Sequence, residues 1–324
     1  MKIDIYTHIS SLKHWDIIEK HVPRTMKQTT ALWDMEERFR IMDKYGDYKQ
    51  VLTFAVPPME LIAGPKESPD IARMHNDEMA EIVHKYPDRF VGGVANLPMN
   101  HMDAALMETD RAITELGLKG VLVYTNVNGK PLDSLEFMPL YEKMSAYDLP
   151  IWIHPYKSIT EPDYRTESES KYSLYGSLGW PHETQVAMCR LVCSGVLEKY
   201  PNLKFITHHC GGGIPYFAKR VAFWLDSIRR AEPDSTLGRL TKEPIEYLRM
   251  FYGDTSIIGA PVLECGHAFF GAEHLVFATD MPYGGEQGEY MLREATKAVT
   301  EMSISDSEKK QIFESNAKKL LNLR

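Results

Sequence analysis

The sequence predicts a single distorted (β/α)₈ barrel, and the order of its segments leads to this prediction. Short runs of β-branched and apolar residues alternate with longer segments that have the periodicity of amphipathic helices. The short runs are apolar almost without interruption, which is typical of parallel strands buried on both faces. A doubly wound sheet would normally carry a glycine-rich fingerprint after its first strand, but Thr7-His8-Ile9-Ser10 stands there instead.

Eight strands are expected, and they cover residues 2–7, 50–56, 90–97, 120–124, 151–154, 203–207, 249–252 and 275–279. Helical patterns cover residues 71–86, 103–116, 135–147, 183–200, 289–302 and 305–321. The last of these predicts a C-terminal helix, because Ser305 and Glu308 have the spacing of a capping box. No linker-like segment divides the chain, so residues 1–324 are expected to form one domain.

A long loop is expected after the fifth strand, over residues 158–177, where serine, glutamate and tyrosine are frequent and no core periodicity is visible. In a barrel such a loop lies over the mouth, where it can act as a lid. The aromatic residues in and around it are candidates for the walls of a flat substrate pocket. They are Tyr156, Tyr164, Tyr172, Tyr175 and Trp180.

Composition excludes several classes of protein. Apolar types make up 44% of the 324 residues and charged types 25%, which argues against a disordered chain. The net charge of −8 and the absence of a lysine or arginine block argue against a nucleic-acid or acidic-membrane partner. The four cysteines are too scattered for a disulfide framework, and neither a leader nor a membrane-spanning pattern is visible. We therefore expect a cytoplasmic protein.

Polar residues of unusual chemistry stand where the predicted strands end. His8 follows the first strand, His154 ends the fifth, His208 and His209 follow the sixth, and Asp280 follows the eighth. The carboxyl ends of barrel strands form the active-site face. Histidine and aspartate meeting there are ligands for a divalent cation such as zinc.

Each of these residues also has a structural interpretation. His8 or His154 alone is more often a hydrogen-bonded core histidine than a ligand, and Asp280 could cap a helix or a turn. If the sixth strand persists, His208 and His209 project to opposite sides, so that one faces the barrel interior and the other packs outward against the helices. Together, however, the positions favour a catalytic mouth.

The same residues carry a resemblance to a known family. Met1-Lys2-Ile3-Asp4-Ile5-Tyr6-Thr7-His8 resembles the opening of the amidohydrolase superfamily, in the branch of the aminocarboxymuconate-semialdehyde and γ-resorcylate decarboxylases. Ile153-His154-Pro155, the block from Thr207 to Tyr216, and Ala278-Thr279-Asp280-Met281-Pro282-Tyr283 resemble its motifs after strands five, six and eight. The segment from Leu178 to Val192 also resembles its helix after the strand-five loop.

This resemblance implies roles for the matching residues. His8, His154 and Asp280 match metal ligands, with Zn²⁺ as the first choice and Mn²⁺ as the second. His209 matches the catalytic histidine that activates water or orients the substrate, and Asp280 would also carry a proton. Arg220 matches an arginine that binds a substrate carboxylate, sometimes across the interface of a homodimer; its structural interpretation is a charge on a helix surface.

Tyr6 departs from the family pattern, because the first strand of the family usually carries His-x-His or Glu-x-His. A neutral phenol is a poor ligand unless the metal removes its proton. Three outcomes stay open: a metal held by His8, His154 and Asp280, ligation by the tyrosinate form of Tyr6, or a site without metal.

The resemblance implies nonoxidative decarboxylation of an aromatic or unsaturated carboxylic acid, catalysed with a divalent metal. Hydrolysis of a lactone, ester or amide, with or without metal, is the alternative, because both reactions use the same residues. A noncatalytic barrel that binds a metabolite is a third interpretation, supported only by Tyr6. The motifs do not identify the substrate.

Overall fold

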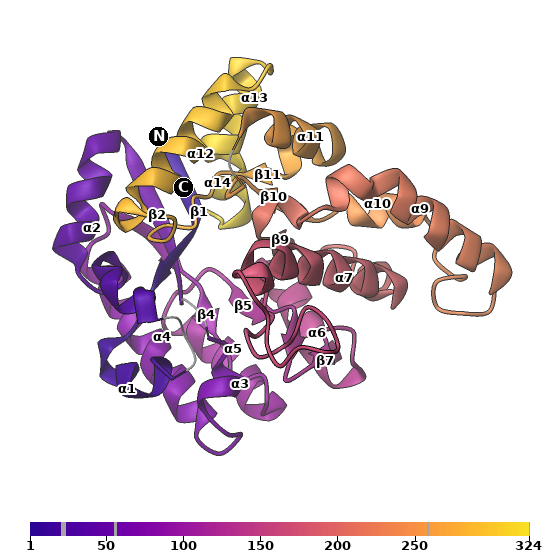
Figure 1. The fold of residues 1–324 in the computed structure, drawn as a ribbon, viewed down its shortest axis with the longest axis horizontal. Coiled ribbons are helices and arrows are strands. Elements are labelled where there is room, and N and C mark those ends of the chain that lie inside the picture. Colours follow the sequence, from indigo (N-terminus) through magenta and orange to yellow (C-terminus); the bar gives the residue numbers. More distant parts are fainter. Residues whose placement is uncertain (21–23, 55–56, 258, 324) are drawn as a thin grey trace.

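The computed structural model describes residues 1–324 except 21–23, 55–56, 258 and 324, and its centre is a barrel of parallel strands. Within these residues the strands pair in two runs, β1-β2-β3 and β11-β10-β9-β8-β5-β4. Their bounds are β1 Lys2–Ile9, β2 Tyr48–Phe54, β3 Phe90–Gly93, β4 Ala95–Asn96, β5 Val121–Tyr124, β8 Ile151–His154, β9 Phe205–Thr207, β10 Tyr252–Asp254 and β11 Leu275–Val276. Figure 1 shows the strands inside a layer of helices.

Two junctions join these runs into a closed ring. At the first, β3 and β4 flank Val94 and act as one strand, because Val94 N–H donates to the carbonyl of Leu52 at 2.9 Å and Ala95 N–H to that of Gly120 at 2.9 Å. At the second, the segment after β11 lies against β1. There Ile5 N–H donates to the carbonyl of Phe277 at 2.9 Å and Asp280 N–H to that of Tyr6 at 3.2 Å. The predicted (β/α)₈ barrel is confirmed.

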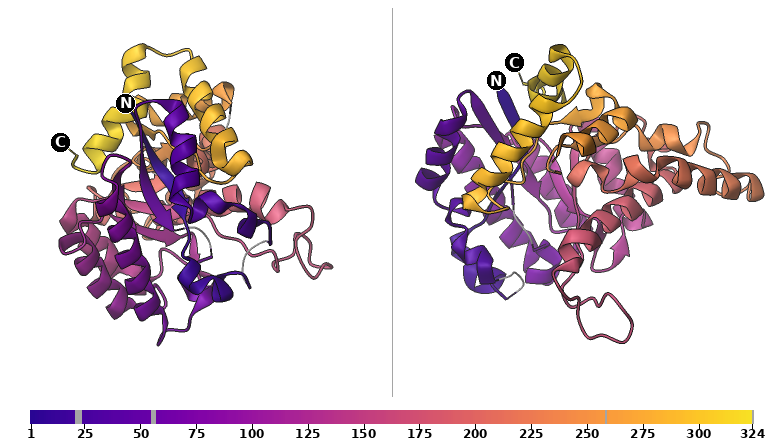
Figure 2. Two further views of the ribbon diagram at one scale, coloured as in Figure 1. Left: turned by 90° about the vertical axis from the view of Figure 1, so that its left-hand side faces the viewer. Right: turned by 45° about the horizontal axis from the view of Figure 1, so that its top comes forward.

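Helices cover the outside of the ring (Figure 2). Their bounds are α1 Trp15–Ile18, α2 Met35–Met42, α3 Met59–Ile62, α4 Ser68–Lys85, α5 Met102–Thr114, α6 Met138–Tyr147, α7 Trp180–Cys193, α8 Val196–Lys199, α9 Ile214–Ala231, α10 Pro244–Leu248, α11 Ala260–Phe270, α12 Glu289–Glu301, α13 Asp306–Lys310 and α14 Asn316–Leu320. A two-stranded hairpin, β6 Asn126–Val127 with β7 Lys130–Pro131, follows β5. Helices α9 and α10 project away from the barrel.

Burial explains why the strand runs could be read from the sequence. Every residue of β5 and β8 is buried, as expected for strands covered on both faces. Val51, Leu122, Trp152 and Ile206 belong to a core cluster that is separate from the larger core shared with the helices. None of the described helices is long and apolar enough to cross a membrane.

Several predicted bounds need correction. The seventh strand lies at Tyr252–Asp254 rather than 249–252, because α10 and the turn after it occupy the chain up to Phe251. The helix predicted over 183–200 begins at Trp180 and is interrupted at Gly195, whose φ of +76° is left-handed. Helices α2, α9 and α11 were not predicted. The predicted end of the second strand, at residues 55–56, lies outside the described residues.

The C-terminal segment has the predicted capping box. Ser305 Oγ accepts from Glu308 N–H at 3.2 Å, and Ser305 N–H donates to Glu308 Oε2 at 2.9 Å. The segment is not one regular helix, however, because a π-helical turn over Gln311–Ser315 separates α13 from α14. Residues 155–173 form the expected irregular loop after β8, but the end of the range predicted for it, 158–177, belongs to a π-helical turn over Tyr175–Gly179.

Candidate active site

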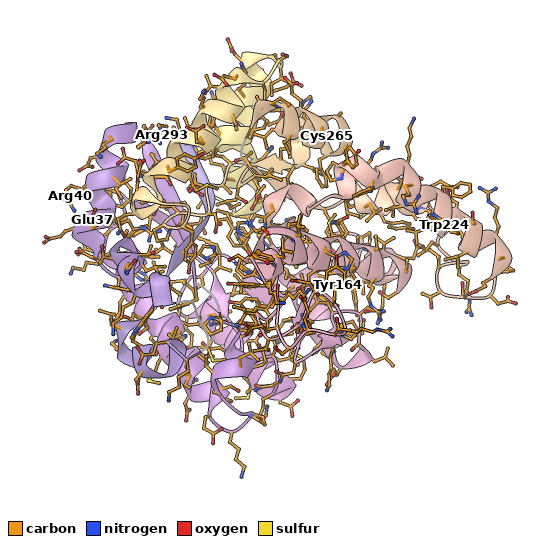
Figure 3. The ribbon with its side chains drawn as sticks, in the orientation of Figure 1. Glu37, Arg40, Tyr164, Trp224, Cys265 and Arg293 are labelled. Atoms are coloured by element: carbon orange, nitrogen blue, oxygen red, sulfur yellow. The ribbon has the colours of Figure 1, made fainter. Side chains whose placement is uncertain are left out.

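A cavity of about 1500 Å³ opens at the carboxyl ends of the strands. His154, Asp280 and Tyr283 lie in its wall, together with residues of the loop after β8 and the start of α7. Of the aromatic residues predicted to wall a pocket, three line the cavity, namely Tyr156, Tyr175 and Trp180. Tyr164 and Tyr172 do not, because they lie at exposed positions of the loop with 73% and 90% of their surface accessible; Tyr164 is labelled in Figure 3.

His8, at the end of β1, is fixed by Thr53 on β2. The hydroxyl of Thr53 lies 3.0 Å from the carbonyl of Thr7, to which it donates, and 2.9 Å from His8 Nδ1. Because a hydroxyl has only one proton, Thr53 Oγ1 accepts from His8 Nδ1–H, and the lone pair of the ring is on Nε2. That atom lies 3.0 Å from Asp280 Oδ1. Burial lowers the pKa of His8, although Asp280 opposes this, so the imidazole is neutral.

His154, at the end of β8, is fixed by its own neighbour. Its Nδ1 donates to the carbonyl of Pro155 at 2.7 Å, since a carbonyl can only accept. Its lone pair is therefore on Nε2 as well. The His154 ring lies 5.4 Å from the ring of His8 and 5.3 Å from the ring of His208. Burial and these two histidines hold the pKa of His154 well below its usual range.

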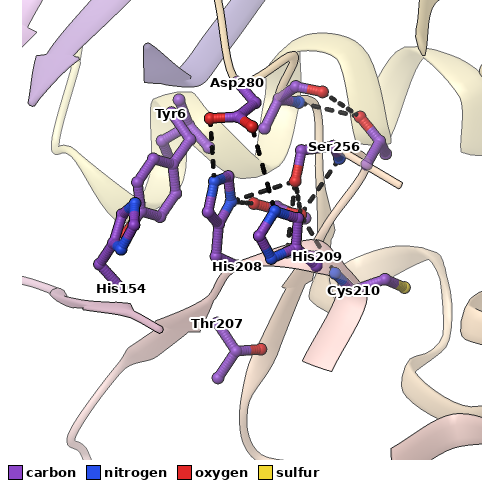
Figure 4. A network of polar contacts seen from close by, with 12 residues as sticks. Tyr6, His154, Thr207, His208, His209, Cys210, Ser256 and Asp280 are labelled. Atoms are coloured by element: carbon purple, nitrogen blue, oxygen red, sulfur yellow. Dashed lines mark hydrogen bonds and ion pairs between the residues drawn. The ribbon is translucent and has the colours of Figure 1, made fainter. Parts of the chain in front are cut away.

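Both His208 and His209 lie at the mouth, so the prediction that one of them packs outward is wrong. Strand β9 ends at Thr207, and His209 and Cys210 have φ of +55° and +54°. This left-handed turn breaks the strand alternation and stacks the His209 ring 4.0 Å from the His208 ring (Figure 4). His209 Nε2 lies 4.0 Å from Asp280 Oδ2.

His208 is held by a carboxylate that sequence analysis missed. Its Nδ1 lies 2.5 Å from Asp254 Oδ2 and 3.0 Å from Ser256 Oγ, and its Nε2 lies 3.3 Å from Asp280 Oδ1. The error in the bounds of the seventh strand hid Asp254, which ends β10. The available signal was the polar run Asp254-Thr255-Ser256, which follows the aromatic pair Phe251-Tyr252 after one glycine.

Charges in the cluster follow from these contacts. Burial alone would lower the pKa of His208, but Asp254 and Asp280 raise it to about 10. Burial and the neighbouring His208 lower the pKa of His209 to about 4. Burial disfavours the Asp280 anion, yet His208 and His8 hold the pKa of Asp280 well below its usual range. Without a metal, the mouth therefore combines carboxylate anions and a protonated His208 with the neutral imidazoles of His8, His154 and His209.

These residues fit a divalent cation. The candidate ligand atoms of His8, His154 and His208 lie within 4.8 Å of one another, and His208, His209 and Asp280 form a second such group. His8 Nε2 and Asp280 Oδ1 both carry lone pairs at a separation of 3.0 Å, so a cation between them would replace repulsion by attraction. Each of the three imidazoles in the first group also has a partner on Nδ1, as metal-binding histidines usually have.

Tyr6 lies against this group without hydrogen bonding to it. Its ring is fully buried and stacks on His208 with centroids 4.0 Å apart and planes inclined by 14°. Its hydroxyl has no hydrogen-bond partner among the described residues. Burial, followed by the negative charge of Asp254, raises the pKa of Tyr6 well above its usual range. The phenol is therefore neutral.

Arg220 is not brought to the cavity within one chain. It lies at an exposed position of α9, the helix that projects from the barrel. A role for Arg220 toward substrate therefore requires a second chain.

Comparisons with known proteins place this site in a family. A family profile described as amidohydrolase matches residues 3–323, and the chain belongs to this family. It is 32% identical over 310 residues to γ-resorcylate decarboxylase of Polaromonas sp., which covers 91% of this chain and 89% of the relative. It is 27% identical over 344 residues to 2-amino-3-carboxymuconate-6-semialdehyde decarboxylase of Dictyostelium discoideum, covering 100% and 92%.

A solved structure from Polaromonas sp. has the same fold. It is a dihydroxybenzoic acid decarboxylase with bound manganese and the inhibitor 2-nitroresorcinol. It matches this chain with a TM-score of 0.82 and 27% identity, and covers 99% of this chain and 97% of the other. The predicted family is confirmed, and its solved relative carries a divalent metal.

Proposed function

We propose that the protein is a metal-dependent nonoxidative decarboxylase of an aromatic or unsaturated carboxylic acid. The observation that carries the proposal is the pair of facing lone pairs on His8 Nε2 and Asp280 Oδ1, 3.0 Å apart beside a cavity walled by Tyr156, Trp180 and Tyr283. Aromatic walls suit a flat ring. The relatives named above act on acids of this kind.

His8, His154 and Asp280 would hold the metal. The ion would supply a Lewis acid for the substrate carboxylate and an adjacent oxygen. In the reaction the bond from the substrate carbon to its carboxylate breaks, the electron pair stays on that carbon, and the carbon takes up a proton as CO₂ leaves. We assign the proton transfer to Asp280: its carboxylate, partly open to the cavity, would take a proton from the solvent there and pass it to that carbon. His209, neutral and partly exposed beside Asp280, orients the substrate.

Zinc is our proposal for the metal, because neutral imidazoles are the main donors and imidazole suits zinc better than manganese. The manganese in the relative makes Mn²⁺ the alternative. Elemental analysis of the purified protein, with an anomalous scattering map at the mouth, distinguishes the two.

We propose further that the chain, one barrel domain over residues 1–324, acts as a homodimer in which Arg220 reaches the partner's substrate. The projecting helix α9 supports this proposal, because it carries large exposed apolar side chains within one helical turn of Arg220; one of them, Trp224, is labelled in Figure 3. Tyr216, Phe223 and Trp224 are 79%, 65% and 55% exposed. Light scattering after gel filtration measures the mass; a monomer contradicts the proposal. The cytoplasmic location stays a prediction.

A panel of acids tests the activity. The panel contains 2,6-dihydroxybenzoate, 6-methylsalicylate, salicylate and benzoate, together with an aryl ester and a lactone. We expect CO₂ release without uptake of ¹⁸O from labelled water, lost on chelation and restored by metal. Ring opening or ester cleavage with ¹⁸O uptake would show a hydrolase instead. Asp280→Asn is the inactive control.

A further inference from the structure

The mouth has a phenol and an imidazole at neighbouring positions. On β1, Tyr6 stands two residues before His8, where the family resemblance implies a histidine or glutamate. Directly after β9, His208 brings an imidazole whose candidate ligand atom lies within 4.8 Å of those of His8 and His154. The rings of Tyr6 and His208 lie in contact, 4.0 Å apart, so the two positions border the same space.

The contacts of His208 prepare it as a ligand. Asp254 Oδ2 and Ser256 Oγ take up its Nδ1–H, so Nε2, the atom that faces Asp280, is the one that a cation would bind after displacing its proton. Asp254 is itself rigid, because its Oδ1 accepts from Cys210 N–H at 3.1 Å, Ser256 N–H at 3.1 Å and Ser256 Oγ–H at 2.7 Å. A carboxylate behind a histidine is the usual support for a metal-bound imidazole.

The stacking of Tyr6 keeps its oxygen away from an ion that His208 binds. Such an ion lies in the plane of the imidazole, along the Nε2 lone pair. The phenol lies in a nearly parallel plane, inclined by 14°, and stacked rings are separated by about 3.5 Å. A metal–oxygen bond is only about 2 Å long. One ion therefore cannot bond both side chains in this arrangement.

We propose that His208 fills the ligand position that Tyr6 leaves vacant, so that the metal is held by His8, His154, His208 and Asp280. Tyr6 packs as a neutral ring that fixes the plane of His208, and Asp254 is the positioning residue behind it. This inference rests on the proposed metal dependence, and it moves the third imidazole from the first strand to the sixth.

The test moves the imidazole from position 208 to position 6 and measures metal binding. The dissociation constants of Zn²⁺ and Mn²⁺ are measured by chelator competition for the wild type, His208→Ala, Tyr6→Phe, and the double variant Tyr6→His with His208→Ala. We expect His208→Ala to weaken binding by at least about 100-fold, since loss of a ligand should exceed the 10–100-fold cost of losing an outer contact. Tyr6→Phe should change it by less than about threefold, and the double variant should recover at least about tenfold.

Spectra and a matched control separate ligation from structural damage. With Fe³⁺ bound, a tyrosinate ligand would give a visible charge-transfer band, and we expect none in the wild type. His75→Ala is the control for removal of a buried imidazole, because His75 also stacks on a ring, Phe54, at 4.5 Å but outside the cluster. If His208→Ala fails to fold, His208→Gln takes its place.

The positioning role of Asp254 is tested by metal affinity measured together with the far-ultraviolet spectrum. Asp254→Asn should weaken metal binding by about 10–100-fold while the far-ultraviolet spectrum is unchanged. Wild-type affinity in both His208→Ala and Asp254→Asn, or a loss in Tyr6→Phe as large as that in His208→Ala, would overturn the inference. Because these are binding constants, the inference can hold even if no acid of the panel is decarboxylated, which would overturn only the proposed function.

Discussion

Strand β1 lies between two buried polar clusters that differ in how many of their polar atoms have hydrogen-bond partners. On one side lies the mouth cluster, which we define as His8, His154, His208, His209 and Asp280. On the other lies the support network, which we define as Asp4, Arg38, Tyr48, Gln50 and Thr279. Both are assembled from β1 and from the segment after β11, and both are largely shielded from solvent.

The support network closes on itself. Asp4 Oδ2 accepts from Tyr48 Oη and Thr279 Oγ1, each at 2.5 Å. Tyr48 Oη accepts from Gln50 Nε2 at 2.9 Å, and Gln50 Oε1 accepts from Arg38 Nε at 2.7 Å. Arg38 Nη1 completes the chain by donating to the carbonyls of His8 at 2.8 Å and Ala31 at 2.9 Å. Donors meet acceptors almost throughout; the exception is Arg38 Nη2.

The mouth cluster instead turns like groups toward each other. His8 Nε2 and Asp280 Oδ1 are both acceptors, and within the described part of the chain no hydrogen bond reaches His8 Nε2, His209 Nδ1 or the adjacent Tyr6 Oη. Leaving buried polar atoms unpaired costs free energy, so their concentration at one end of a strand marks the place where a ligand completes them. The hydrogen-bonded groups of the support network stabilise the fold, whereas the unpaired groups of the mouth cluster are placed to bind a ligand.

The largest effect expected from this comparison is the loss of activity in Asp280→Asn. Replacing the carboxylate removes one metal ligand and the proton carrier, so kcat/KM should fall roughly 10³-fold, within the range for lost acid–base catalysis. Any decrease in the unfolding free energy should be the smaller effect, because the attraction of Asp280 to His208 and His8 is opposed by the burial of its charge. Steady-state kinetics and chemical denaturation measure the two quantities; near-normal turnover would refute the role of Asp280.

The support network should respond in the opposite way. Arg38→Met leaves the acceptors on Gln50, His8 and Ala31 buried without a donor, and should lower the unfolding free energy by about 3 to 4 kcal/mol. Arg40→Met on the same helix is the control, because Arg40 is exposed and pairs with Glu37 at the surface. A loss in Arg38→Met no greater than that in Arg40→Met would contradict the structural role of the network.

Glu60 on α3 extends the comparison, because it has a buried carboxyl oxygen without a hydrogen-bond partner that belongs to neither cluster. Its Oε2 has no hydrogen-bond partner among the described residues, and burial raises its pKa to about 7. The neutral form favours the fold. Its contribution is therefore complete below pH 4.5 and is lost as the pH rises through 7. Between pH 5 and 8, Glu60→Gln should lose about 2 kcal/mol less unfolding free energy than the wild type. Chemical denaturation at the two pH values measures this difference. If the wild type and Glu60→Gln lose the same unfolding free energy between them, burial does not raise the pKa of Glu60 as described.

The smallest effect concerns the partner of His8. Thr53→Val removes the acceptor for His8 Nδ1–H and allows the ring to change tautomer, so metal affinity should fall about tenfold. Thr53→Ser keeps the hydroxyl and should bind metal as the wild type does. Calorimetric titration of both variants with Zn²⁺ measures the difference; equal affinities would show that the Thr53 hydroxyl does not set the tautomer.

Local pattern was enough to predict most strands and part of the site. Buried strands such as Ile151–His154 are recognisable in the sequence, because strands covered on both faces are apolar throughout. The rule that the carboxyl ends of barrel strands face the mouth then brings His8, His154 and Asp280 together. The seventh strand was misplaced because its residues Tyr252, Gly253 and Asp254 lack the apolar character of the others. Asp254 was missed with it.

The orientation of His208 and His209 was beyond local pattern for a different reason. Strand alternation assigns them opposite faces, but left-handed backbone at His209 and Cys210 overrides it. Non-glycine residues adopt that conformation only when tertiary contacts hold them there, such as the bond from Cys210 N–H to Asp254 Oδ1. The exposed position of Arg220 likewise depends on where α9 projects, which no periodicity reveals.

The ring closes between β1 and the segment after β11, and this seam joins residues from the two ends of the chain. His8 and Asp280 stand on opposite sides of it, next to the bonds from Asp280 N–H to Tyr6 and from His8 N–H to Met281. A transient opening of the seam, even with the rest of the barrel intact, would separate two of the proposed ligands. The lifetime of a bound ion is therefore tied to the opening of a single strand pair, and amide exchange at His8 and Asp280 reports on it residue by residue.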